Sequence, residues 1–217
     1  MPQILSAREA VAGIPDGATI MLAGFLGAPE ALVDALVEQG ARGLTIIAND
    51  TGFENAGIGK LVHARRVRKA IVSHIGTNPE TQRLLSSGKL EVELVPQGTL
   101  AERVRAGGHG LGGVLTPTGV GTAVEEGKAV HEIGGRRYLL ELPLRADVAL
   151  LHASVADRAG NLFHRMATRN WNPLMAMAAD RVVVSTERVV EVGDLDPDVV
   201  HTVGVLVDVL VPQEGRL

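Results

Sequence analysis

The 217-residue sequence contains no cysteine, which excludes a disulfide framework, a thiolate metal site and a cysteine nucleophile. Its aromatic residues are limited to three Phe, one Tyr and one Trp, and its formal net charge of -4 offers no broad basic face. Nucleic-acid binding needs basic groups for phosphates and aromatic groups for bases, so we expect none. No set of His, Asp and Glu has metal-ligand spacing, and we predict no metal site.

Long apolar runs are also missing, since no window approaches the roughly 18 apolar residues of a membrane-spanning helix. The N-terminal segment reaches charge at Arg8 and Glu9, too early for a secretory signal. We therefore expect no membrane insertion, and the absence of cysteine fits a cytoplasmic location. The composition, with 46% hydrophobic and 21% charged residues, is globular. No linker, repeat or low-complexity stretch divides the chain, which predicts a single domain over residues 1–217.

Strands and helices alternate in the first half of the sequence. Proline suits a first helical turn and glycine the residue beyond the last, so Pro29 and Gly40 bracket one predicted helix. Asn78 and Pro79 begin a second helix, and a third runs from about Gly98 to Ala106. Short apolar runs predict four strands, at residues 19–23, 44–48, 70–73 and 90–95. This order predicts an α/β fold with an open, mainly parallel sheet flanked by helices.

The second half is predicted to be richer in strand. The dipeptide Gly134-Gly135 lies between two strand-like segments and predicts a β-hairpin. The expected strands of this half lie at residues 130–132, 137–140, 147–153, 161–165 and 181–186.

Polar and small residues follow each of the four predicted strands of the first half. Ligands of open parallel sheets bind beyond the carboxyl ends of strands, where helix N-termini and free backbone amides converge. Uncharged hydrogen-bonding groups there suit a carboxylate or carbonyl ligand. The same residues are also ordinary turn and cap residues, and this interpretation stays open. The four segments are residues 24–29, 49–52, 74–78 and 96–99.

Two further Gly-rich stretches cover residues 106–113 and 116–122. Neither ends in the Gly-Lys-Ser/Thr of a P-loop, and neither is a dinucleotide fingerprint after a first strand, which disfavours ATP and NAD. They can lie along a thin, extended ligand or serve only as connectors.

The sequence as a whole resembles the α (A) subunits of two-chain family I CoA-transferases, the acetate, acetoacetyl and succinyl-CoA:3-oxoacid CoA-transferases. The resemblance covers about residues 14–210 in the order and spacing of the family. One departure lies in the first strand signature, where Ala23 replaces a glycine and the turn to Pro29 is shorter. The motifs that carry the resemblance are Leu44-Thr-Ile-Ile-Ala-Asn-Asp-Thr51, Ser73-His-Ile-Gly-Thr-Asn-Pro-Glu-Thr81, Val95-Pro-Gln-Gly-Thr-Leu-Ala-Glu102, Leu115-Thr-Pro-Thr-Gly-Val-Gly-Thr122, Glu125-Glu-Gly-Lys128, Pro143-Leu-Arg-Ala-Asp147, Asp157-Arg-Ala-Gly-Asn161 and Ala167-Thr-Arg-Asn170.

This resemblance implies a sugar-phosphate isomerase/CoA-transferase-like fold and a ping-pong transfer of CoA through a glutamyl thioester. The donor is expected to be succinyl-CoA or acetyl-CoA, and the acceptor a short-chain 3-oxoacid or fatty acid. CoA passes as a substrate, so no bound cofactor is expected. The nucleophilic glutamate belongs to a partner β subunit, near a Ser-Glu-Asn-Gly motif that this sequence lacks. The implied assembly is an α2β2 heterotetramer.

The matching motifs also imply site residues. Asn49 and Gln97 are the main candidates to line the acid-substrate pocket, because an amide donates hydrogen bonds without adding a charge that would quench the nucleophile. No catalytic residue is expected on this chain. Four glycines are further candidates for backbone walls around the substrate, namely Gly24, Gly76, Gly98 and Gly119.

Several other residues have a structural and a functional interpretation. Glu125 and Glu126 follow a Gly-rich loop and are interpreted as structural or subunit-contact residues. His74 and His109 are not needed as acid-base groups, because a thiolate already leaves well at neutral pH. A basic cluster, residues 63–69, can attract CoA phosphates or form the solvated end of a helix. An alternative function for the whole chain is a non-catalytic sugar-phosphate-binding or regulatory protein of the same fold.

Overall fold

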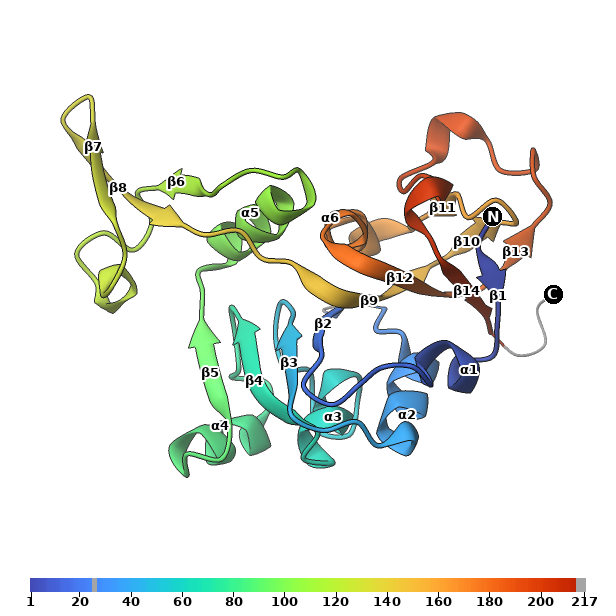
Figure 1. Cartoon of the computed structure of the whole chain (residues 1–217), viewed down its shortest axis with the longest axis horizontal. Coiled ribbons are helices and arrows are strands. Elements are labelled where there is room, and N and C mark those ends of the chain that lie inside the picture. The colour runs from blue at the N-terminus through green and yellow to red at the C-terminus, as the bar shows by residue number, and fades with distance from the viewer. Residues whose placement is uncertain (25–26, 214–217) are drawn as a thin grey trace.

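A large parallel sheet forms the centre of the structure, a computed structural model that describes residues 1–24 and 27–213 (Figure 1). Phe25 and Leu26 of the first Gly-rich turn lie outside the described residues. The sheet has eight strands in the order β1-β14-β12-β9-β2-β3-β4-β5, and the pairings found among the described residues are all parallel. Its strands are β1 (Gln3–Ile4), β2 (Thr19–Leu22), β3 (Leu44–Ile47), β4 (Val67–Val72), β5 (Glu91–Leu94), β9 (Ala146–Ala153), β12 (Ala179–Thr186) and β14 (Val209–Pro212).

Both faces of this sheet are buried. Successive side chains of a strand point to opposite faces, so Ile20 and Leu22 of β2 pack in one hydrophobic core, and Met21 and Ala23 pack in the other. The first core includes residues of α1 (Ala7–Val11), α2 (Glu30–Gln39), α3 (Ile58–His63) and α4 (Pro79–Ser86). The second includes residues of α5 (Gln97–Gly108) and α6 (Asn172–Met177). The predicted open parallel sheet flanked by helices is confirmed.

The predicted helix boundaries in the first half are largely confirmed. Helix α2 follows Pro29 and ends at Gly40, whose φ of 97° is the left-handed conformation that glycine adopts without a steric penalty. Asn78 caps α4, because its side chain accepts a hydrogen bond from the Thr81 backbone N–H at 3.1 Å. Gly40 thus fixes the end of α2, and Asn78 fixes where the chain leaves the loop that follows β4.

Helix α5 differs from the prediction at both ends. It starts at Gln97, which is therefore a first-turn helical residue rather than the end of a strand, and it continues through Gly107 and Gly108. A Cβ atom on Gly107 would lie 1.9 Å from the Leu144 carbonyl oxygen, and one on Gly108 would lie 2.7 Å from Met177 Cβ. Close packing of α5 against neighbouring segments therefore needs these glycines inside the helix, in spite of their low helix propensity.

The second half is rich in strand, as predicted, but it builds three different sheets. Strands β9, β12 and β14 complete the large sheet next to β2. The predicted hairpin at Gly134-Gly135 is confirmed as β7 (Val130–Ile133) and β8 (Arg136–Glu141), which form a three-stranded sheet with β6 (Val114–Thr116). This unit, termed the arm, extends away from the large sheet beside α5 (Figure 1). The third sheet contains β10 (Val155–Asp157), β11 (Leu162–Phe163) and β13 (Val189–Val190).

A buried carboxylate joins the arm to α5. Glu141, only 1% exposed, pairs with Lys128 Nζ at 2.6 Å and lies 3.9 Å from Arg103 Nε. Arg103 also binds Glu93 of β5 at 2.8 Å. Opposite charges therefore compensate one another at the base of the arm, which lowers the cost of burying the carboxylate. Across the described residues we find no helix long and apolar enough to cross a membrane.

Candidate functional site

The two predicted amide residues lie side by side at one edge of the large sheet. Asn49 follows β3 and is 7% exposed, and Gln97 follows β5 as the first residue of α5. Gln97 Nε2 donates a hydrogen bond to Asn49 Oδ1 at 3.3 Å. The carboxyl ends of parallel strands share one edge, which is why residues 48 positions apart meet here. The structure brings the two amides together, and their substrate-binding role stays a prediction.

Two neighbours determine how these amides are oriented. Asp50 Oδ2 accepts a hydrogen bond from Asn49 Nδ2 at 2.7 Å. A carboxylate only accepts hydrogen bonds, so Asn49 must turn its NH2 group to Asp50 and its oxygen to Gln97. Gln97 then turns its own oxygen to the Ser73 hydroxyl, which donates to it. Each amide NH2 group carries two N–H donors, and the hydrogen bonds found among the described residues use one of them on Asn49 and one on Gln97.

Ser73 is the residue of this site that the sequence interpretation missed. It directly follows β4, and its hydroxyl also lies 2.8 Å from the Asn49 carbonyl oxygen. The sequence predicted Ser73 to be the last residue of a strand over 70–73, whereas β4 ends at Val72 and Ser73 lies just beyond it. The hydrogen bond from Ser73 to Gln97 depends, however, on where Gln97 lies in the fold, and the sequence around Ser73 does not show this.

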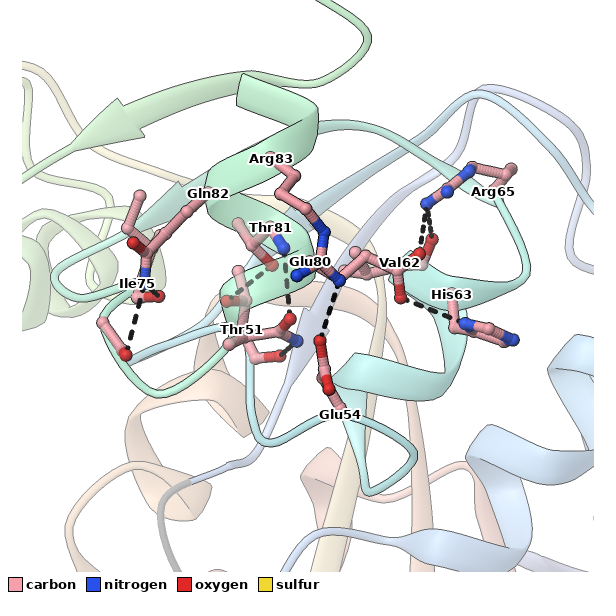
Figure 2. Close-up of polar contacts among 12 residues, drawn as sticks. Thr51, Glu54, Val62, His63, Arg65, Ile75, Glu80, Thr81, Gln82 and Arg83 are labelled. Atoms are coloured by element: carbon pink, nitrogen blue, oxygen red, sulfur yellow. Dashed lines mark hydrogen bonds and ion pairs between the residues drawn. The ribbon is translucent and has the colours of Figure 1, made fainter. Parts of the chain in front are cut away.

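A buried polar cluster holds the loop that follows β3 (Figure 2). Thr51 accepts a hydrogen bond from Asn78 Nδ2 at its carbonyl oxygen, at 3.0 Å, and its hydroxyl binds the Thr81 hydroxyl at 3.0 Å. Thr51, Asn78 and Thr81 are each fully buried. Because buried hydrogen bonds of this kind are costly to break, the loop carrying Asn49 and Asp50 is anchored to the N-terminus of α4.

The four candidate glycines occupy different surroundings. A Cβ atom on Gly24 would lie 4.0 Å from Asp50 Oδ1, which places this glycine beside the amide pair. A Cβ atom on Gly76 would lie 2.6 Å from Cε1 of the His74 ring. A Cβ atom on Gly98 of α5 would instead meet open space. Gly119 belongs to the segment after β6, where its neighbours are Val124 and Leu139. Gly119 is therefore part of the arm, and the nearest atoms found for it among the described residues belong to the arm rather than to the amide pair.

A pocket of about 290 Å³ lies beside Asp50, the residue that accepts a hydrogen bond from Asn49. Most of its wall is glycine, alanine or apolar side chain. Glu30 lies in this wall, but its Oε1 accepts the Gly57 N–H at 2.9 Å and its Oε2 pairs with Lys60 at 2.7 Å. The lining residues are Gly24, Gly27, Ala28, Glu30, Asp50, Gly52, Phe53, Ala56, Gly57, Ile58 and Thr77.

The basic cluster of residues 63–69 is largely engaged within the chain. Glu80 binds His63 at 3.0 Å and Arg65 at 2.8 Å (Figure 2). Burial works to raise the pKa of Glu80, but the hydrogen bonds from His63 and Arg65 outweigh it and the pKa is lowered. Lys69 pairs with Glu91 and Glu93. These ion pairs support the structural interpretation of the cluster over phosphate attraction.

Glu125 also has structural partners. Its carboxylate accepts the Gly121 backbone N–H at 2.6 Å and pairs with Arg137 across the arm. The Gly121 N–H and then Arg137 lower the pKa of this carboxyl. His109 contacts the Arg105 carbonyl oxygen of its own helix at 2.8 Å. Both observations agree with the structural interpretation of these residues.

Comparison with known proteins places the chain in one family. The sequence model described as Coenzyme A transferase matches residues 4–213. The chain is 52% identical to the acetate CoA-transferase subunit alpha of Escherichia coli (strain K12), covering 99% of both chains. It is 53% identical to the acetoacetyl-CoA:acetate/butyrate CoA transferase alpha subunit of Clostridium acetobutylicum, covering 91% of this chain and 92% of that subunit.

A solved structure shows the same fold. The acyl-CoA transferase apoenzyme of Escherichia coli O157:H7 superimposes with a TM-score of 0.90 at 25% identity, covering 100% of this chain and 48% of that longer chain. This chain thus corresponds to about half of that polypeptide. Together with the family match and the two full-length relatives, this shows that the chain belongs to the Coenzyme A transferase family, among the alpha (A) subunits of these enzymes.

Proposed function

We propose that this chain is the α half of an enzyme that moves CoA from an acyl-CoA to a short-chain 3-oxoacid or fatty acid. The acyl-CoA is acetyl-CoA or succinyl-CoA. The hydrogen-bonded pair of Asn49 and Gln97 carries the proposal. Its free N–H groups are uncharged donors at the edge of the sheet where α/β proteins bind ligands. The four side chains of the network, those of Asn49, Asp50, Ser73 and Gln97, include no Lys or Arg, which favours this function over sugar-phosphate binding.

The proposed chemistry is a covalent exchange in which a glutamate carboxylate attacks the acyl-CoA thioester. The carbon–sulfur bond breaks, giving an acyl-glutamyl anhydride and CoA thiolate. The thiolate then attacks the glutamyl carbonyl, which releases the first acid and leaves a glutamyl-CoA thioester. The second acid repeats the two steps in reverse. Each step passes through an oxyanion, to which the N–H groups of Asn49 and Gln97 donate.

We assign the nucleophilic glutamate to a partner β subunit. Among the described residues that line the pocket, Glu30 is the single glutamate, and both of its oxygens are already occupied by Gly57 N–H and Lys60. A carboxylate held in this way is a weak nucleophile, because attack would break both interactions. The reaction is then placed at the boundary between the two kinds of subunit. We further propose, from the family resemblance, a cytoplasmic α2β2 assembly that uses CoA as a substrate rather than a bound cofactor.

The decisive experiment compares this chain alone with the chain co-expressed with a candidate β subunit. Transfer of CoA from acetyl-CoA to labelled acetate is measured in both preparations, followed by borohydride or hydroxylamine trapping of an activated glutamate. We expect transfer only in the complex and trapping only on the β chain. Full-rate transfer by the isolated chain, or a trapped glutamate on it, would overturn the division of roles.

A further inference from the structure

The pocket beside Asp50 has the composition of a site for a hydrocarbon chain. Its walls include Gly24, Ala28, Ala56, Gly57 and Ile58, and its volume of about 290 Å³ is at the small end of ligand sites. The positions across it are close, since a Cβ atom on Gly57 would lie 3.1 Å from Ala28 Cβ. The space exists because many of the lining residues are glycine or alanine, and the surface around it is mainly apolar. A few methylene groups can be buried there.

The pocket and the hydrogen-bond network of the amide pair share one residue, Asp50. Asp50 belongs to both, because its Oδ2 accepts from Asn49 Nδ2 at 2.7 Å and its side chain lines the pocket. Asp50 Oδ1 accepts the Gly52 N–H at 2.7 Å, and Gly52 lies in the pocket wall as well. An acid whose reacting carboxyl group lies at Asn49 and Gln97 therefore directs the rest of its chain past Asp50.

The charge of the pocket discriminates between two kinds of acid. Both charged residues of its described lining, Glu30 and Asp50, are carboxylates. Lys60 offsets part of this charge, but its ammonium group is shared between Glu30 and Asp34, at 2.7 Å from each. A second carboxylate entering the pocket would meet like charge and lose its hydration, whereas an uncharged chain would meet neither cost.

We propose that this pocket holds the acyl chain of the acid substrate, and that it selects short monocarboxylic acids with an uncharged chain against dicarboxylic acids. The inference rests on the proposed function and narrows the donors named there to acetyl-CoA, because the acyl group of a donor occupies the same pocket as the acid that it releases. It places selectivity in the loops that follow β2 and β3 of this chain, around Ala28, Asp50 and Ala56.

The first test uses the assembled enzyme, this chain with its β subunit, and acetyl-CoA as the donor. Labelled acetate, butyrate and succinate are compared as acceptors, because butyrate and succinate share a four-carbon chain and differ in the second carboxylate. We expect kcat/KM for butyrate to exceed that for succinate at least 30-fold. A smaller ratio would overturn the pocket assignment while transfer to acetate keeps the proposed function. Absence of transfer to all three acids would instead be the failure of the proposed function.

Variants then locate the selectivity. Ala56→Leu reduces the space, so kcat/KM for butyrate should fall at least 10-fold more than kcat/KM for acetate, and Ala28→Val should act in the same direction. Glu30→Gln keeps an acceptor for the Gly57 N–H but removes a charge, and should raise the succinate-to-butyrate ratio at least 5-fold. Ala12→Leu, at the exposed end of α1, is the matched control and should change neither ratio. Equal effects of Ala56→Leu and Ala28→Val on butyrate and acetate would contradict the proposal.

Discussion

At the scale of single residues, the proposed site depends on which atoms the two amides leave free of hydrogen bonds to their neighbours. Asn49 is buried and bonded to Asp50, whereas Gln97 is exposed and bonded to Asn49 and Ser73. The Asp50 carboxylate determines the donor and the acceptor of each of these hydrogen bonds, because a carboxylate has no proton to donate. The sequence alone names the amides, and the neighbouring Asp50 determines that both present N–H groups.

Gln97→Met should therefore impair the reaction far more than the fold. The substitution keeps the length of the side chain and removes both N–H donors. Loss of one oxyanion donor typically reduces kcat by about 10² to 10³. We expect a fall of that order in kcat of the assembled enzyme, with the melting temperature unchanged. Gln3→Met, at an exposed position of β1, is the matched control, and an unaltered kcat in Gln97→Met would remove Gln97 from the site.

Ser73 should behave as a positioning residue. Ser73→Ala leaves the Gln97 oxygen without its donor, so the amide is free to rotate. Because a single hydrogen bond contributes about 1 kcal/mol, we expect kcat to fall about 5-fold to 10-fold. Ser73→Thr retains a hydroxyl and should restore most of the activity. Steady-state kinetics of both variants measure kcat and KM separately. If Ser73→Thr failed to restore kcat, the effect of Ser73→Ala would be a structural defect rather than the loss of a positioning hydrogen bond.

At the scale of elements, the position of Gln97 depends on helix α5, of which it is the first residue. The position of α5 depends in turn on how closely its last turn packs against neighbouring segments. The helix packs so closely against the segment before β9 that a Cβ on Gly107 would lie only 1.9 Å from the Leu144 carbonyl oxygen. Hydrophobic periodicity correctly indicated a helix here. It could not indicate that the two glycines after Ala106 continue the helix, because close approach of another backbone outweighs propensity.

Gly107→Ala should be strongly destabilising. The added methyl group would lie 1.9 Å from the Leu144 oxygen, so backbone must move, at a cost of about 3 kcal/mol in the free energy of unfolding. Urea denaturation of the assembled enzyme or of the isolated chain measures it. Gly98→Ala, in the same helix but facing open space, should instead stabilise by about 0.5 to 1 kcal/mol. Equal stability of the two variants would contradict the packing argument.

At the scale of the whole molecule, a buried histidine should make stability depend on pH. His164 is fully buried, with Nδ1 at 3.0 Å from the His152 carbonyl oxygen and Nε2 at 3.0 Å from the Thr202 hydroxyl. Burial lowers the pKa of His164 from 6.5 to about 4. The unfolded chain therefore binds this proton at a higher pH than the folded chain, and stability falls as pH decreases from 6.5 toward 4.

The expected loss over that interval is about 3 kcal/mol in the free energy of unfolding. Chemical denaturation at pH 7, 6, 5 and 4.5 measures it, and His164→Gln should flatten this part of the profile. His131→Gln, at an exposed position of β7, is the control and should retain the slope. A wild-type profile without a decline below pH 6.5 would contradict the assignment to His164.

The sequence by itself determined the alternation of strands and helices in the first half, several of the caps and the family. These features depend on neighbouring residues: the turn at Gly40, the cap at Asn78 and the apolar runs of the strands are local. It also identified Asn49 and Gln97 as amides in the segments that follow two predicted strands.

Only the tertiary structure decided which distant residues meet. It paired β9 with β2 and added β12 and β14 beyond β9. It also placed Gly119 in the arm and brought Ser73 into hydrogen-bond contact with Gln97. It also formed the pocket, whose described walls come from the loops after β2, β3 and β4 and from the first residues of α2 and α3. The physical reason is that side-chain periodicity reports which face of an element is buried, whereas the partner across that face depends on packing among segments far apart in the chain.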